Sequence, residues 1–120
     1  MPTNRAATQP DHPDPRLRGR TLAVPFDRVW KEALLLAAKK QGWTVLDADD
    51  LKGVIRAEAR TLVFRFTDDV EIRIGLDQDG QTRVDMTSAS RVGKSDLGTN
   101  ARRIGNFLRG LDQRLARAPR

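Results

Sequence analysis

The chain has 120 residues and a formal net charge of +6, with 38% hydrophobic and 32% charged side chains, which are the proportions of a soluble globular protein. It contains no cysteine, which excludes disulfides, thiol nucleophiles and cysteine-ligated metal centres. The single histidine, His12, lies between prolines near the N-terminus. A histidine metal cluster is therefore excluded, and a catalytic triad would depend on this one residue.

The excess positive charge lies at the two ends of the chain. Residues 1–20 carry four arginines and two aspartates, residues 101–120 carry six arginines and one aspartate, and the 80 residues between them hold 12 basic and 13 acidic side chains. No apolar run approaches the roughly 20 residues of a membrane span. The N-terminus lacks the apolar core of a secretory signal, so a cytoplasmic location is the default expectation, and envelope association stays open.

Residues 1–16 combine prolines with few hydrophobic side chains, which predicts a flexible Pro-rich tail ahead of a single α+β domain over residues 17–120. A short strand is expected near residues 20–24. Pro25 suits the first position of a helix, and Asp27 in its first turn favours the helix dipole. Apolar residues then recur at helical spacing over residues 29–37, and Gly42 ends the helix.

From residue 43 onward the apolar period changes to two, which is typical of strands. Strands are expected over residues 43–48, 54–60, 62–66, 70–74 and 82–86, with a hairpin turn at Asp79-Gly80. The last helix is expected from residue 96 or 99 to 116, with an apolar stripe and five arginines on its opposite side: Arg102, Arg103, Arg109, Arg114 and Arg117. The prediction is an α+β two-layer sandwich, an antiparallel sheet of about four to six strands with two helices on one face.

The segment before the last helix contains Gly93-Lys94-Ser95, the closing triplet of a phosphate-binding P-loop. A P-loop also needs a glycine six residues before the lysine and a parallel βαβ sheet around it. Ser88 occupies that position within an expected strand of an antiparallel meander, so a true P-loop is rejected. A looser anion site at the start of the helix, beside Arg91 and Lys94, and a purely structural loop both remain open.

Asp68 and Asp69 form a second candidate group, a pair of carboxylates. Adjacent residues of a strand point to opposite faces of the sheet, so the two cannot easily act on one substrate. An ion pair of one of them with Arg91 or Arg103 is the alternative.

Residues 88–104 resemble the bacterial family called domain of unknown function 1499. The family pattern is a Ser-x-Ser-Arg-x-Gly segment, then Asp-x-Gly-x-Asn, then an Arg-Ile pair that opens the last helix. The matching residues are Ser88, Ser90, Arg91, Gly93, Asp96, Gly98, Asn100, Arg103 and Ile104. Residues 66–70 and Gly42-Trp43 also fit, and the resemblance spans roughly residues 12–116. The family has no established activity, so the resemblance implies a fold and a surface patch and names no reaction.

We therefore expect a non-enzymatic binding or interaction module that uses the loop 91–100, without metal or cofactor. The candidate residues are Ser90, Arg91, Gly93, Lys94, Asp96, Gly98 and Asn100, supported by Asp68, Asp69 and Arg103. The alternative is electrostatic binding of nucleic acid or an anionic membrane by the arginines of the last helix. An enzyme that uses Asp68, Asp69 or Asp96 as a base is the remote alternative. The sequence does not identify the ligand or partner.

Overall fold

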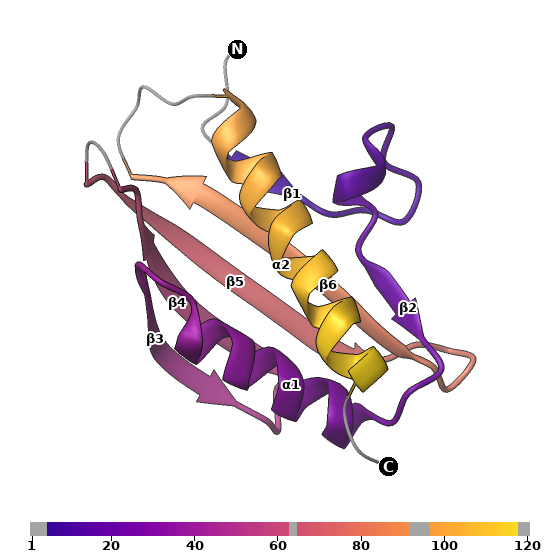
Figure 1. Cartoon of the computed structure of the whole chain (residues 1–120). Helices are drawn as coiled ribbons and strands as arrows, with labels where there is room; N and C mark the ends of the chain where they lie inside the picture. The colour runs from indigo at the N-terminus through magenta and orange to yellow at the C-terminus, as the bar shows by residue number, and fades with distance from the viewer. Residues whose placement is uncertain (1–4, 63–64, 92–96, 118–120) are drawn as a thin grey trace.

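The computed structural model describes residues 5–62, 65–91 and 97–117 of the chain (Figure 1). Its elements, in chain order, are β1 (Arg5–Ala7), a 3-10 turn η1 (Pro15–Leu17), β2 (Arg20–Leu22), α1 (Phe26–Lys39), β3 (Trp43–Asp49), β4 (Val54–Arg60), β5 (Thr67–Leu76), β6 (Thr82–Ser90) and α2 (Leu97–Arg117). Within these residues, six strands form one antiparallel sheet, and both helices lie on the same face of it (Figure 1). The expected α+β two-layer architecture is confirmed.

The sheet has the strand order β1-β6-β5-β4-β3, and β2 also pairs with β6. Strands β3 to β6 form the expected meander. β1 pairs with residues 87–89 of β6 and β2 with residues 82–84, so the two short strands share one edge of β6. The opposite edge of the sheet is β3, which carries a bulge between Val45 and Asp47.

Two of the expected strands differ from the structure. Residues 70–74 belong to a longer strand, β5, whereas the strand expected over residues 62–66 does not form among its described members. Leu62 and Phe66 are exposed, and Arg65 has a φ of 59°. The Thr61 N–H donates to the Phe66 carbonyl at 2.8 Å, which holds the residue after β4 beside the residue before β5. Phe64 lies outside the described residues.

The N-terminal segment also differs from the flexible tail expected over residues 1–16. Residues 5–7 form β1, and residues 15–17 form η1 with Asp14 as its cap. The stabilising contacts are backbone pairing with β6 and the burial of Leu17, which is 6% exposed. The sequence pattern does not indicate this pairing because the partner strand lies about 80 residues further along the chain.

The core lies between the helices and the sheet. Alternate residues of β4, β5 and β6 face the helices and are buried, and the apolar stripes of both helices cover them. The fully buried large side chains include Ile55, Ile72, Met86, Ile104, Phe107, Leu108 and Leu111. Trp43 stacks on Phe107, with 5.3 Å between ring centroids and 8° between ring planes, which adds to the area buried. These contacts fix where α2 begins relative to the ends of β5 and β6.

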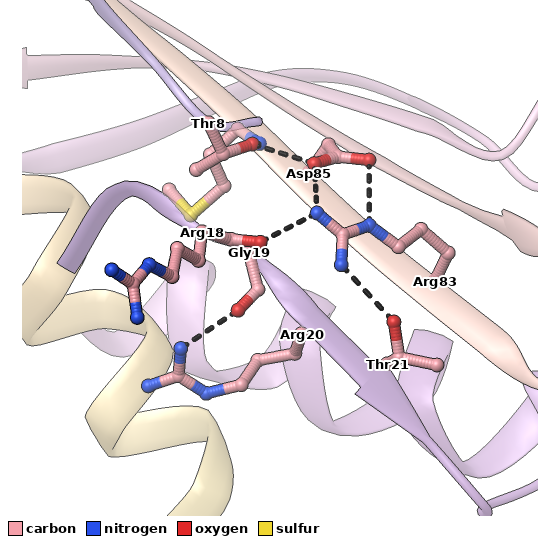
Figure 2. Close-up of polar contacts among 8 residues, drawn as sticks. Thr8, Arg18, Gly19, Arg20, Thr21, Arg83 and Asp85 are labelled. Atoms are coloured by element: carbon pink, nitrogen blue, oxygen red, sulfur yellow. Dashed lines mark hydrogen bonds and ion pairs between the residues drawn. The ribbon is translucent and has the colours of Figure 1, made fainter. Parts of the chain in front are cut away.

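A polar seam closes the gap between β1 and β2 on the edge of β6 (Figure 2). Thr8 donates its backbone N–H to the Met86 carbonyl and accepts the Met86 N–H on its hydroxyl, each at 2.9 Å. The hydroxyl in turn donates to Asp85 at 2.7 Å. Arg83 binds both oxygens of Asp85 and donates to the Arg18 carbonyl (Figure 2). The unpaired backbone of β6 is thereby satisfied where neither short strand reaches.

Gly19 is required at this seam. It has a φ of 71°, and a Cβ atom there would lie 2.6 Å from the Val84 carbonyl oxygen. Any other residue would strain the backbone and collide with β6.

Candidate functional site

A cluster of polar side chains lies where β5 begins, β6 ends and α2 begins; we call it the root cluster, and it consists of Asp68, Ser88, Ser90, Asn100 and Arg103. Asp68 lies opposite Ser90 in the sheet, and Ser88 lies two residues before Ser90, so all three face the helices. Asn100 and Arg103 are three residues apart on α2 and therefore share one helix face. Pairing of the strands and helix periodicity together bring residues from three elements to one point.

Arg103 is the centre of the root cluster. Its Nη1 lies 2.7 Å from Asp68 Oδ2 as an ion pair, and it donates to Ser88 Oγ at 3.1 Å and to Asn100 Oδ1 at 2.9 Å. Ser88 also donates to Asn100 Oδ1 at 2.7 Å, and the Asn100 amide donates to Ser90 Oγ at 3.1 Å. The network ties the end of β6 to the start of α2 on both sides of the intervening loop.

The root cluster is withdrawn from solvent. Asp68 is 1% exposed and Asn100 3% exposed, and the Arg103 side chain is 11% exposed. The Nη1 group of Arg103 carries two hydrogens but faces three acceptors. Asp68 Oδ2 lies at ion-pair distance yet accepts no hydrogen bond among the described residues.

Asp69 lies in a different environment on the opposite face of the sheet, which neither helix covers. Arg91 donates from Nε to both oxygens of Asp69, at 3.2 and 3.1 Å, and from Nη2 to Asp69 Oδ1 at 2.8 Å. The same Nη2 group donates to Glu58 at 2.5 Å. The hydrogen bonds to Asp69 and then to Glu58 raise the pKa of Arg91. Because Glu58 and Asp69 are direct neighbours across β4 and β5, Arg91 also offsets their mutual repulsion.

The structure divides the predicted site residues into two groups. Asp68, Ser90, Asn100 and Arg103 come together in the root cluster, whereas Asp69 and Arg91 lie on the other side of the sheet. Both aspartates form ion pairs, Asp68 with Arg103 and Asp69 with Arg91, so the ion-pair alternative is confirmed. Gly98 lies in the first turn of α2, and Gly93, Lys94 and Asp96 lie outside the described residues.

Two participants were not singled out as site residues from the sequence. Ser88 belongs to the family pattern and to an expected strand but is not among the candidate site residues, although its two-residue spacing from Ser90 indicates a shared face. Glu58 carries no sequence signal, because its contact with Arg91 depends on the register of three strands.

The arginine face of α2 is narrower than we expected. Arg103 is largely enclosed in the root cluster, and Arg114 pairs with Glu32 of α1 at 2.8 Å. Both residues flank the apolar stripe and reach neighbouring elements. Arg102, Arg109 and Arg117 are exposed.

The described residues set limits on the chemistry of this site. They contain no group of three or more His, Cys, Asp or Glu side chains that could hold a metal ion. The Asp68 carboxylate is enclosed and paired with Arg103. Among the helices of the described residues, none is long and apolar enough to cross a membrane.

These features define a class of α+β protein in which a four-stranded meander, widened by short N-terminal strands, carries two helices on one face and a buried Asp–Arg cluster at one end. The family model described as "Protein of unknown function (DUF1499)" matches residues 2–111, and the chain belongs to this family. The resemblance noted in the sequence is confirmed.

The chain was also compared with curated proteins and with solved structures. A search of curated proteins gave no significant match. Among solved structures, the crystal structure of TTHA0849 from Thermus thermophilus is similar, with 14% sequence identity and a TM-score of 0.45, and the match covers 98% of this chain and 100% of that chain.

Proposed function

We propose that the protein is a non-enzymatic interaction module that binds a protein partner at the end of the sheet where the root cluster lies. The observation that carries this proposal is the root cluster itself, which ties the end of β6 to the start of α2 and so holds both ends of residues 91–96, the part of the expected loop 91–100 that joins these two elements. Ser88 and Ser90 precede the loop on β6, and Asn100 and Arg103 follow it on α2. A binding loop with fixed ends loses less conformational entropy when it binds.

The energetics favour a role beyond packing for this cluster. Replacing a buried ion pair with apolar side chains of similar volume is often neutral or stabilising. Outside the root cluster, the buried residues in the described part of the chain are apolar except for Thr82. A buried charge pair at the root of a loop is therefore better explained by the loop geometry that it specifies than by the stability that it contributes.

The surroundings favour a protein partner over an anionic ligand. The charge of Arg91 is neutralised by Asp69 and Glu58, and that of Arg103 by Asp68. Leu62 is 74% exposed and Phe66 is 41% exposed at the same end of the sheet. Arg91 donates its N–H to the carbonyl of Thr67, the residue after Phe66, at 3.4 Å. Exposed apolar side chains beside neutralised charges resemble the composition of a protein interface.

Site-specific photo-crosslinking in cells that produce the protein tests this proposal. A photoreactive benzoylphenylalanine replaces Leu62 or Phe66 in one set of proteins. In the control set it replaces Leu51 or Leu76, which are 96% and 66% exposed at the opposite end of the sheet. We expect one discrete adduct from positions 62 and 66 and none from the controls. Equal adducts from both sets, or none from either, would overturn the proposal.

Two further measurements make the result specific. Asp68→Asn removes the ion pair at nearly constant volume, and we expect it to abolish the adduct while the circular dichroism spectrum stays that of a folded protein. A titration of the wild-type protein with inorganic phosphate, followed by amide NMR, tests the anion alternative. Saturable shifts at Arg91, Thr99 and Asn100 would show an anion site and contradict the proposal, whereas unchanged spectra support it.

A further inference from the structure

We propose that the exposed surface of α2 and the adjoining N-terminal segment binds the phosphate backbone of duplex nucleic acid. The basic face consists of Arg18, Arg102, Arg109 and Arg117, all of which are exposed. Arg109 donates to Asn106, Arg117 to the Gln113 carbonyl and Arg18 to the His12 carbonyl. These three guanidinium groups contact neutral acceptors, so their charges are available to an external anion.

The N-terminal segment belongs to this face because it packs directly against α2. The side chain of Arg16 lies over Gly105, where an added Cβ would be 3.2 Å from the Arg16 Cβ. Arg20 pairs with Asp112 of α2 at 2.9 Å. Arg18 lies between these two anchors and reaches solvent beside the helix.

Charge is segregated between the two layers of the protein. Helix α2 carries five arginines and one aspartate, whereas residues 41–91, which include strands β3 to β6, carry seven basic and ten acidic side chains. A polyanion is therefore attracted to the helical side and repelled from the sheet side. Such an asymmetry orients the encounter before any contact is made.

The side chains of α2 favour nucleic acid over a membrane. Ile104, Phe107, Leu108 and Leu111 are fully buried, and none of the exposed large hydrophobic side chains in the described residues lies on α2. The helix thus has no apolar face to insert into a bilayer. Asn106 and Gln113 lie exposed between the arginines and are suitable donors to phosphate and sugar oxygens.

The same residues favour a duplex over a single strand. Binding of single strands relies on exposed aromatic side chains that stack on bases, and the one aromatic residue of α2, Phe107, is buried. Arg102 and Arg117 are 15 residue steps apart, which corresponds to about 22 Å along the helix. That length corresponds to about six base pairs of duplex. The geometry predicts contacts to the backbone that do not depend on base sequence.

Fluorescence anisotropy with the full chain and a labelled duplex of about 16 base pairs tests this inference over a salt series. Release of counterions from about three phosphates, one for each of Arg18, Arg109 and Arg117, predicts that affinity falls about 40-fold between about 50 and 200 mM salt. A triple variant carries Arg102→Gln, Arg109→Gln and Arg117→Gln. Its affinity should fall only about 3-fold over the same salt range, because about one phosphate contact remains. Its affinity at low salt should also be lower.

A matched control carries the same loss of charge on the other layer. The control variant carries Arg56→Gln, Arg60→Gln and Arg73→Gln, at three positions that are exposed on β4 and β5. Its affinity and the salt dependence of its affinity should stay close to those of the wild type. Equal losses in both triple variants would show a general effect of net charge and overturn the inference. It would be overturned equally by a lack of binding at about 50 mM salt, by tighter binding of a single strand of the same length, or by a preference for anionic phosphatidylserine vesicles. None of these readouts involves the root cluster, so they are independent of the proposed protein partner.

Discussion

Asp68 and Asp69 are consecutive residues of β5, yet the sheet gives them opposite environments. Asp68 faces the helices, is 1% exposed and pairs with an arginine that is itself almost enclosed. Asp69 faces the uncovered side, where its side chain is 55% exposed and pairs with the half-exposed Arg91. Two aspartate–arginine ion pairs whose aspartates are adjacent in sequence therefore differ in solvation. The pair of Asp68 and Arg103 is enclosed by the fold, whereas the pair of Asp69 and Arg91 is a solvated surface contact.

The difference in solvation determines what each pair contributes. Removing one partner of a buried pair leaves an uncompensated charge in a low-dielectric interior. An exposed pair gains little over hydration of its two members and is screened by salt. The two aspartates should therefore respond very differently to the same substitution.

The largest expected effect is that of Asp68→Ala. We expect the free energy of unfolding to fall by about 3–5 kcal/mol, because Arg103 then remains in the root cluster without its counter-ion. Urea denaturation followed by circular dichroism measures this loss. Asp69→Ala is the matched control, and its loss should be several-fold smaller. Equal losses for the two variants would show that burial does not distinguish the two ion pairs.

A double substitution tests whether the root cluster contributes to stability or only to geometry. Asp68→Leu combined with Arg103→Met removes both charges and replaces them with apolar side chains. We expect its free energy of unfolding to lie within about 2 kcal/mol of the wild-type value, whereas Asp68→Leu alone should be destabilised as much as Asp68→Ala. If the double variant is as unstable as the single one, the ion pair is a net stabilising interaction and the argument for a specialised role loses its basis.

A smaller effect is expected on the exposed face from Arg91→Gln. The change leaves Glu58 and Asp69 opposite each other without a cation between them, so the thermal midpoint should fall modestly at low ionic strength. At about 0.5 M NaCl the difference from wild type should largely vanish, because exposed charges are screened. Arg103→Gln provides the contrast, and its destabilisation should persist in the same salt.

The smallest expected effect concerns an exposed pair formed within η1. Arg16 donates hydrogen bonds from its side chain and from its backbone N–H to Asp14, and they lower the pKa of Asp14 from 3.8 to about 2. Since the pKa is lower in the folded protein, the interaction is fully present above about pH 4 and is lost as the pH falls towards 2. Carboxyl NMR should show this midpoint, and Arg16→Gln should return it towards 3.8. An unchanged midpoint in the variant would exclude the Arg16 side chain as the cause and leave the backbone N–H of residue 16.

The sequence predicted the parts of this fold that depend on local pattern. Helical spacing placed α1 and α2, alternation placed the meander, and the two-residue geometry of a strand separated Asp68 from Asp69. The family resemblance indicated Ser90, Asn100 and Arg103, which the structure brings together with Asp68.

The parts that sequence reasoning missed depend on contacts between distant segments. The pairing of β1 with β6, the contact of Glu58 with Arg91 and the burial of Arg103 each require the register of the sheet or the docking of α2. Helical periodicity grouped Arg103 with the other arginines of α2. Periodicity describes one helix only and cannot show that Asp68, on β5, lies beside Arg103.

The shared edge of β6 has a consequence for the order of folding. Arg5 pairs with Ala89 and Thr21 with Arg83, so β1 and β2 lack their partner until β6 has been synthesised. Contacts this distant in sequence form slowly, and a chain whose meander has already formed exposes one edge of β6 in the meantime. An unprotected edge can pair with another chain. Slower pairing of residues 5–22 with β6 should therefore lengthen the time during which this edge is open to another chain.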